Sequence, residues 1–438
     1  MILEKAKELI KDKNLCNNCL GRQFAMLGTG LTNKGRGSSL KNSILLEADM
    51  SFKETEEEKE LIDLAFSYDL ATKTLERRKI KQKKENKKEK NPCYLCKGLF
   101  KNLDFYADQA INRLENLEFS DFLVGTKLTT DLAQREEELH IEHGSKYSEN
   151  IKSEINRELG KIISKKTGKE VNFEKPDVVV VLNLDTEDIE LEINPLYIYG
   201  RYMKYSREIP QCEWRCPVCE GKGCMRCDNT GYLYDQSVEE IISKPILKTT
   251  KGKKSVFHGS GREDVDVRML GNGRPFVIEI KEPKKRDPDL NKLKNEINEK
   301  DNPVKVTDLR FVEKETVADI KQARSPKTYK ATIKLPEIEL RELKKALDHL
   351  EDIEVEQKTP KRISRRPQKN RKRKIFNTDL VEIKDNKAEI EIKAEAGTYI
   401  KELIHGDEGN TKPSLKDIIG KEIKCERLDV IKVHYDFN

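Results

Sequence analysis

Four Cys-X-X-Cys pairs constrain the fold of this chain more than any other feature of its sequence. Each pair supplies two of the four thiolates that a structural zinc ion needs, and unpaired cysteines of this spacing are typical of a reducing compartment. The sequence therefore predicts one or two structural Zn2+ ions, each joining the backbone segments of its ligands. The eight cysteines are Cys16, Cys19, Cys93, Cys96, Cys216, Cys219, Cys224 and Cys227.

The last two pairs lie in the short segment CPVCEGKGCMRC, residues 216–227. Four residues separate them, and Gly221 and Gly223 permit the tight turn that brings four thiolates around one ion. Reduced cysteines without a metal are the competing interpretation, but thiols so close together would oxidise readily. Zinc is therefore favoured, with a structural role.

The first two pairs are separated by 73 residues, so only the fold can bring them together. A redox role competes with a shared zinc site here, but neither pair lies at a recognisable strand-to-helix turn. One pair alone is only half of a zinc site, which favours a shared site. Because no nearby histidine or carboxylate suggests an open coordination position, this site is also expected to be structural.

Length and composition bound the class of protein. A chain of 438 residues allows about two to four domains. Charged side chains make up 37% of it, and the net charge of +6 conceals local basic clusters. The N-terminus is charged and lacks an apolar core, so it is not a signal peptide, and the apolar run VVVVLNL from Val178 is too short to span a bilayer. We expect a cytoplasmic protein without a membrane partner.

Periodicity predicts an α+β fold in more than one domain. Residues 100–205 alternate between strand-like and helical segments, among them FSDFLVGTKL, the helix IKSEINRELGKIISKKTG, and paired strands from PDVVVVLNLD to GRYMKY. Beyond residue 235, the strands FVIEI, ATIKL, DIEVEQ, KAEIEIKAEAGTY and ERLDVIKVHYDF are separated by irregularly spaced helices, which favours a mixed, mostly antiparallel sheet. We place the domain boundary between an accessory region, 1–235, and a second domain, 236–438.

The segment KTPKRISRRPQKNRKRK, residues 358–374, contains ten basic residues and no acidic one. Like charges at this density repel one another and gain most when phosphates neutralise them, so we interpret the segment as a loop that grips nucleic acid. A solvated surface loop is the alternative. Residues 73–90 are also basic, but glutamates dilute them, and a solvated surface is at least as good an interpretation there.

Acidic residues, arginines and glycines are concentrated in HGSGREDVDVRMLGNGRPFVIEI, residues 258–280. Strand-like alternation of DVDVR would place Asp264, Asp266 and Arg268 on one face. Gly259 and Gly261 allow the backbone to approach a ligand closely, and the chain has no Ser-His-Asp set, Walker loop or GxSxG motif to supply another chemistry. A structural turn whose arginines neutralise its carboxylates is the alternative.

A second unusual stretch is AEAGTYIKELIHG, residues 394–406. It predicts a strand that turns at Gly397 and enters a short helix, with Tyr399, Ile400 and Lys401 at the junction. Taken singly, Tyr399 and Ile400 could be ordinary core residues, and Lys401 could be an exposed residue at the start of the helix.

Together these stretches resemble one family. GREDVDVR is similar to the catalytic-aspartate motif of pseudouridine synthases, and AGTYIKELIH to their GTYIR-type motif. With LCNNCLGRQF and CYLC in the expected order, the chain resembles the archaeal-type tRNA pseudouridine synthases that act on uridines 54 and 55. The resemblance implies an N-terminal zinc-containing, THUMP-like α/β domain at about 50–205, a pseudouridine-synthase catalytic domain, and the TΨC arm of tRNA as partner. It leaves the cysteine cluster at 212–230 unassigned.

The same resemblance implies the site residues. It assigns catalysis to Asp264, packing on the target base to Tyr329, and closure of the pocket to Leu428. Tyr399, Ile400 and Lys401 would contact the substrate, and Lys401 or Arg262 would keep the aspartate ionised. Moving a uracil from N1 to C5 involves no redox step or phosphate donor, so no organic cofactor is needed. We expect a monomer.

Two alternatives remain open from the sequence alone. A THUMP-containing methyltransferase or thiolation enzyme would need a glycine-rich strand-to-helix turn, whereas the nearest glycine cluster, GNGRPF, precedes a strand. A non-catalytic zinc-ribbon RNA-binding protein would leave Asp264, Tyr329 and Lys401 without a role.

Overall fold

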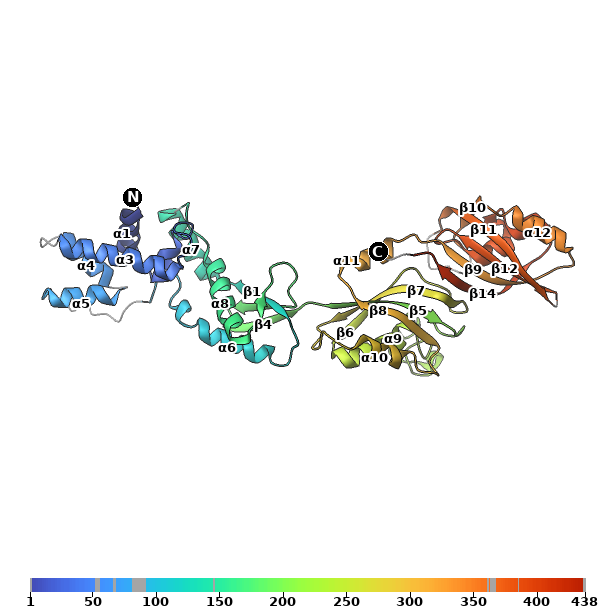
Figure 1. The fold of residues 1–438 in the computed structure, drawn as a ribbon, viewed down its shortest axis with the longest axis horizontal. Helices are drawn as coiled ribbons and strands as arrows, with labels where there is room; N and C mark the ends of the chain where they lie inside the picture. Colours follow the sequence, from blue (N-terminus) through green and yellow to red (C-terminus); the bar gives the residue numbers. More distant parts are fainter. Residues whose placement is uncertain are drawn as a thin grey trace. The chain divides into compact units, whose positions relative to one another are not determined.

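A computed structural model describes residues 2–51, 56–65, 68–80, 92–144, 146–360, 362, 368–384 and 386–435 (Figure 1). The chain forms two compact units, Met1–Asn194 and Pro195–Asn438. The expected boundary at 235/236 therefore falls inside the second unit. The physical reason is strand β5 (Leu196–Lys204), which we expected to end the THUMP-like fold but which pairs with strands β7 and β8 of the second unit.

The first unit begins with helices. The Thr32 side chain caps α3 by accepting a hydrogen bond from the Gly35 N–H at 3.0 Å. Residues 81–90 of the basic stretch at 73–90 lie outside the described residues. The helices are α1 (Ile2–Asp12), α2 (Asn17–Arg22), α3 (Asn33–Met50), α4 (Glu56–Ala65) and α5 (Asp69–Arg77).

An α/β fold completes the first unit. Its sheet has the order β2-β1-β3-β4, in which β1 runs parallel to β2 and β3, and β3 and β4 are antiparallel. Alternation in β1 buries Phe122 and Val124 beneath α8, whose C-terminal turn ends at Gly168 with φ 69°. The elements are α6 (Leu103–Leu114), β1 (Asp121–Lys127), α7 (Thr130–His143), α8 (Ile151–Thr167), β2 (Glu170–Val171), β3 (Val178–Asn183) and β4 (Asp188–Ile193).

The second unit is built on a ten-stranded sheet. Its order is β13-β10-β11-β12-β9-β14-β7-β5-β8, with β6 paired to β7. In the described part of this unit only β14 and β7 pair in parallel, so the predicted mixed, mostly antiparallel sheet is confirmed. The strands after β5 are β6 (Lys254–Gly259), β7 (Arg268–Lys281), β8 (Val304–Phe311), β9 (Lys327–Lys334), β10 (Ile353–Lys358), β11 (Asn370–Lys384), β12 (Lys387–Ala394), β13 (Thr411–Lys412) and β14 (Lys424–Val433).

Helices cover this sheet where its apolar side chains face them. Helices α9 and α10 pack near β8, and α11 packs on β6 and β7 (Figure 1). Leu343 and Leu347 of α12 are buried in the same core as Ile390 and Ile392 of β12. No helix in the described ranges is long and apolar enough to cross a membrane. The helices are α9 (Val238–Thr250), α10 (Leu290–Ile297), α11 (Glu315–Gln322), α12 (Leu340–Asp348), α13 (Ile400–His405) and α14 (Leu415–Ile419).

The basic segment at 358–374 is not one loop. Residues 370–374 belong to β11, where Lys372 lies opposite Glu356 of β10. A run of arginines and lysines hides strand periodicity because it lacks apolar alternation, and the cross-strand carboxylates compensate its charge. Lys358 ends β10, and Lys361 and residues 363–367 of the segment lie outside the described residues.

Candidate active site and cysteine clusters

The carboxylate-rich motif forms a loop between β6 and β7. The expectation that DVDVR is a strand is wrong, because a turn closes here through the Val267 N–H, which donates to the Asp264 carbonyl at 3.1 Å. Arg268 is already the first residue of β7. It points to Asp429 of β14, with Nη2 2.7 Å from the carboxylate, and so joins the two parallel strands rather than facing Asp264.

A buried acid anchors this loop. The hydroxyl of Tyr202 donates to Glu263 at 2.9 Å, and Arg274 Nε lies 2.8 Å from the same carboxylate. Lys204 Nζ donates to the carbonyls of Asp264 and Val265, at 3.3 and 2.8 Å. With the backbone fixed on both sides, the Asp264 side chain stays 38% exposed, which leaves its carboxylate accessible to a substrate.

Among the residues that the structure describes, two cations contact the Asp264 carboxylate. Arg362 Nη1 lies 2.7 Å from it and Lys401 Nζ 3.6 Å. Lys401 also donates to Asp266 at 2.7 Å, and although burial alone raises the pKa of Asp266, this hydrogen bond holds it below its usual value. Arg362 Nε donates to the buried Glu402 at 2.6 Å. The site is therefore a chain of alternating charges centred on Asp264.

Arg362 and Glu402 were not among the residues that the sequence singled out. Arg362 belongs to the basic segment, where nothing distinguishes it from its neighbours, and Glu402 follows Lys401 in the GTYIK-type stretch. The sequence feature that could have pointed to Glu402 is its position directly after Lys401, near the start of the predicted helix.

Three of the expected substrate residues supply buried side chains from different elements. Tyr329 of β9, Leu428 of β14 and Ile400 of α13 are 8%, 6% and 3% exposed. Burial raises the pKa of Tyr329 to about 12, and the negative charges of Glu263 and Asp264 add to this effect. The Tyr329 hydroxyl therefore stays protonated, within the electrostatic field of the loop.

Tyr399 and Arg262 have other immediate partners. Tyr399 is the N-cap residue of α13, and both its backbone N–H and its carbonyl hydrogen bond to the Gln357 side chain at 2.9 Å. Its position confirms the predicted turn at Gly397, where φ is 84°. The Arg262 guanidinium, expected beside Asp264, lies over the ring of Trp214 at 5.0 Å.

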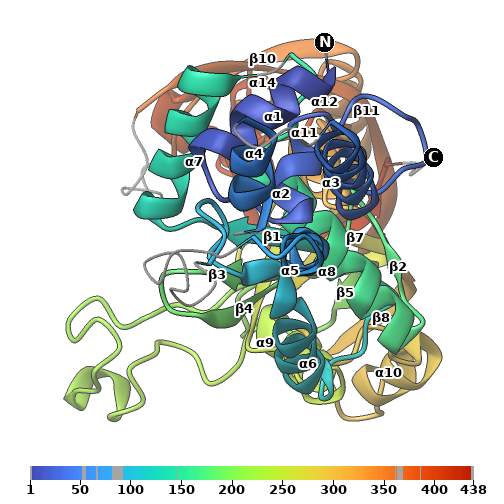
Figure 2. The ribbon, with the colours of Figure 1, turned by 90° about the vertical axis from the view of Figure 1, so that its left-hand side faces the viewer.

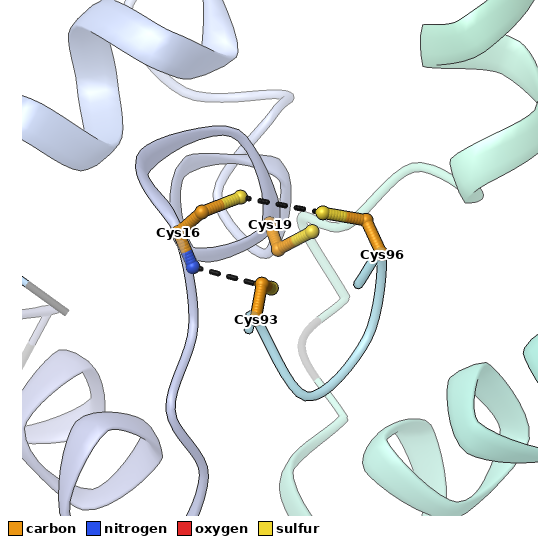
Figure 3. A group of neighbouring side chains, drawn as sticks. All are labelled: Cys16, Cys19, Cys93 and Cys96. Carbon is orange, nitrogen blue, oxygen red and sulfur yellow. Dashed lines mark hydrogen bonds between the residues drawn. The ribbon is translucent and has the colours of Figure 1, made fainter. Parts of the chain in front are cut away.

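The two separated cysteine pairs form one cluster. The sulfurs of Cys16, Cys19, Cys93 and Cys96 all lie within 4.8 Å of one another, and Cys16 Sγ is 3.7 Å from Cys96 Sγ (Figure 3). Sulfurs around a tetrahedral zinc with bonds of about 2.3 Å are about 3.8 Å apart, whereas disulfide sulfurs are about 2.0 Å apart. The donor set and its spacing fit a structural zinc ion.

The second cluster has the same geometry. Cys216 and Cys224 are 3.8 Å apart at Sγ, as are Cys219 and Cys227. The Gly231 N–H points to Cys227 Sγ at 3.3 Å, one of several backbone donors that stabilise thiolates in such knuckles. Two separate four-cysteine sites suit two zinc ions, the upper end of the expected range.

Comparison with known proteins decides the family. The family model described as "Pus10, C-terminal" matches residues 197–434. A second model, described as "Pus10 THUMP domain, archaeal", matches residues 106–183, which lie within the region expected to be THUMP-like. The chain belongs to the Pus10 family. This membership makes it a pseudouridine synthase, an isomerase, and decides against the methyltransferase, thiolation and non-catalytic alternatives.

Relatives match the Pus10-family chain along almost its whole length. The "tRNA pseudouridine synthase Pus10" of Methanothrix thermoacetophila is 43% identical, covering 99% of this chain and 94% of its own. Its counterpart in Methanocaldococcus jannaschii is 42% identical, covering 98% and 93%. Among solved structures, a Cbf5-Nop10-Gar1 complex shows 15% identity and a TM-score of 0.31, covering 53% of this chain and 48% of that one.

Proposed function

We propose that this pseudouridine synthase acts on tRNA, at uridines 54 and 55 of the TΨC arm, with Asp264 as its catalytic carboxylate. The single observation that supports Asp264 is its setting. It is an exposed carboxylate on a rigidly anchored loop, with Arg362 and Lys401 in contact. The relatives named tRNA pseudouridine synthases support tRNA as the substrate.

The reaction needs only protein groups. The bond from ribose C1′ to uracil N1 breaks, the base rotates, and C1′ bonds to C5, whose proton leaves while N1 gains one. Oxidation state and composition are unchanged, so no organic cofactor takes part. Asp264 acts as nucleophile or as base at the sugar, and Arg362 and Lys401 place two positive charges beside its carboxylate.

The uridine must leave its stack to reach this carboxylate. Tyr329, Ile400 and Leu428 provide the aromatic and apolar surface that receives the uracil, while Tyr399 and Lys401 lie at the start of α13. The THUMP domain of the first unit and the basic residues at 358–374 hold the rest of the tRNA, mainly by its shape and phosphates. The enzyme acts as a monomer.

Substitution of the carboxylate tests its role directly. Asp264→Asn should abolish pseudouridine formation on a tRNA transcript while tRNA binding persists. Asp266→Asn is the matched control, because it removes a carboxylate from the same loop that also contacts Lys401. It should keep measurable activity. An active Asp264→Asn enzyme would show that another group performs the chemistry.

The position of modification needs a separate experiment. A transcript with cytidine at position 54 or at position 55 should yield product only at the uridine that remains of the two. A transcript with cytidine at both positions should yield no product. Product mapped outside the TΨC arm in the doubly substituted transcript would contradict the assigned target.

A further inference from the structure

The second cysteine cluster has no part in the chemistry described above, yet the segment that carries it contacts the catalytic loop. It lies in the segment between β5 and α9, the yellow-green excursion at the lower left of Figure 2. Backbone hydrogen bonds from Cys216 to Gly231 at 2.8 Å and from Leu233 to Trp214 at 2.9 Å close its neck. The cluster and Trp214 therefore belong to one cross-linked hairpin.

Trp214 connects this hairpin to the catalytic loop. Its ring packs edge-on against Tyr234, with centroids 5.6 Å apart, and its face receives the Arg262 guanidinium at 5.0 Å. Arginine over an indole face is a favourable cation–π contact with a defined geometry. Arg262 is two residues before Asp264, so this contact acts on the backbone next to the proposed catalytic carboxylate.

A second contact fixes the preceding residue. Gln211, at the base of the hairpin and 5% exposed, donates to the Gly261 carbonyl at 2.9 Å and to the Tyr202 hydroxyl at 2.8 Å. Tyr202 in turn donates to Glu263. Gly261 has φ 83°, a conformation that glycine adopts without steric cost, and because glycine is also flexible, the hydrogen bond from Gln211 helps to fix this bend. Successive residues of the loop are thus each fixed by a contact, and the hairpin contacts two of them, Gly261 and Arg262.

We propose that the second cysteine cluster, when it holds zinc, positions the catalytic loop through Trp214 and Gln211. The metal cross-links the hairpin, the hairpin fixes the indole and the glutamine amide, and these set the backbone from which Asp264 projects. Trp214 and Arg262 are positioning residues. The inference rests on the proposed function of Asp264, and it gives Arg262 a geometric role in place of the electrostatic one expected from the sequence.

Trp214 is the only tryptophan in the sequence, so its fluorescence reports the hairpin in the full-length protein. Cys224→Ser, in the second cluster, should shift its emission and lower the zinc content by one ion. Cys96→Ser is the matched control, because it removes a ligand from the other cluster, in the first unit. It should lower the zinc content equally and leave the emission unchanged. An unchanged emission in Cys224→Ser would overturn the proposal.

Single-turnover kinetics test the link to the loop. Trp214→Ala should lower the rate of the chemical step by about 10²-fold, the effect of a displacement near 1 Å, with tRNA affinity unchanged. Trp214→Phe keeps a ring under Arg262 and should recover most of the rate. Met225→Ser, at the 93% exposed tip of the hairpin, controls for a general effect of altering it. A parallel loss of tRNA affinity in Trp214→Ala would make the hairpin an RNA contact and overturn the proposal.

The pH profile separates position from charge. Arg262→Met should slow the reaction by the same factor at every pH and leave the shape of the profile unchanged, whereas a changed shape would show that Arg262 acts through its charge. Activity of Asp264→Asn would refute the proposed function. An inactive Asp264→Asn enzyme together with a fully active Trp214→Ala enzyme would refute only this inference.

Discussion

Arg362 is the residue on which most of the site depends, because it joins two carboxylates with different surroundings. Asp264 is 38% exposed and Glu402 only 2%, while Arg362 itself is 39% exposed. Removing the arginine leaves Glu402 buried without this partner. Buried charges that lose their partners destabilise proteins strongly, but water reaches this guanidinium and screens its charge.

We therefore expect Arg362→Gln to lower the free energy of unfolding by about 1–2 kcal/mol. It should also reduce pseudouridine formation, since Asp264 loses its nearest cation. Urea denaturation and a product assay measure the two effects. Arg362→Lys keeps the charge but cannot span both carboxylates, so its activity should lie between those of the wild type and the glutamine variant. Full activity of Arg362→Gln would remove the arginine from the mechanism.

Asp429 provides a pH-dependent contribution to stability. Burial alone raises its pKa, but hydrogen bonds from Arg268 at 2.7 Å and Arg207 at 2.6 Å hold the pKa below its ordinary value of 3.8. A carboxyl with a lowered pKa stabilises the fold fully above its unfolded value, and this stabilisation is lost as the pH falls through the folded value. Asp429→Asn should thus cost about 2 kcal/mol at pH 7 and progressively less below pH 3.8. A difference that stays constant on acidification, measured by denaturation, would contradict this assignment.

Some residues of the candidate site could be suggested from the sequence and others could not, for a physical reason. Asp264 and Lys401 stand in stretches whose residue order is itself distinctive, so the resemblance could suggest them as candidates. Arg362 is 98 positions from the aspartate that it contacts, and only the folded hairpin of β10 and β11 determines which arginine of a basic run reaches it.

At the scale of elements, strands with apolar alternation were predictable, and the basic strand was not. β9 alternates buried and less buried side chains along KTYKATIK, which is the period-2 signal of a strand. β11 begins with NRKRK, where both faces carry charge, so its sequence suggests a loop. Pairing with β10 forms the strand nevertheless, because Glu356 and Asp352 supply opposite charges.

The lysines of β11 keep enough exposure to meet phosphates. Lys372 is 64% exposed and Lys374 44%. If both bind tRNA phosphates, Lys372→Ala with Lys374→Ala should weaken binding and reduce the slope of log K against log salt by about 0.7–0.9 for each phosphate that is no longer neutralised. Lys248→Ala on the exposed surface of α9 is the control and should leave the slope unchanged. An unaltered slope in the double variant would make this part of β11 ordinary solvated surface.

At the scale of the whole molecule, composition indicated several domains but could not place the boundary. Residues 196–204 follow the β3–β4 hairpin of the first unit directly, and nothing in LYIYGRYMK shows which sheet they join. Only pairing with strands about 70 to 110 residues further on assigns them to the second unit. The family matches, 106–183 and 197–434, fall on either side of the same position.

This boundary can be tested by cutting the chain in two ways. A cut after residue 194 leaves β5 in place between β7 and β8, so each piece should fold and bind one zinc ion. A cut after residue 235 removes from the second sheet Ile198, Tyr199 and Tyr202, all of them at most 1% exposed. Each such side chain contributes about 1.5–3 kcal/mol on burial, and a domain has only about 5–15 kcal/mol in total. The piece 236–438 should therefore lack a cooperative thermal transition while 195–438 shows one; cooperative unfolding of both would mean that β5 is dispensable to the sheet.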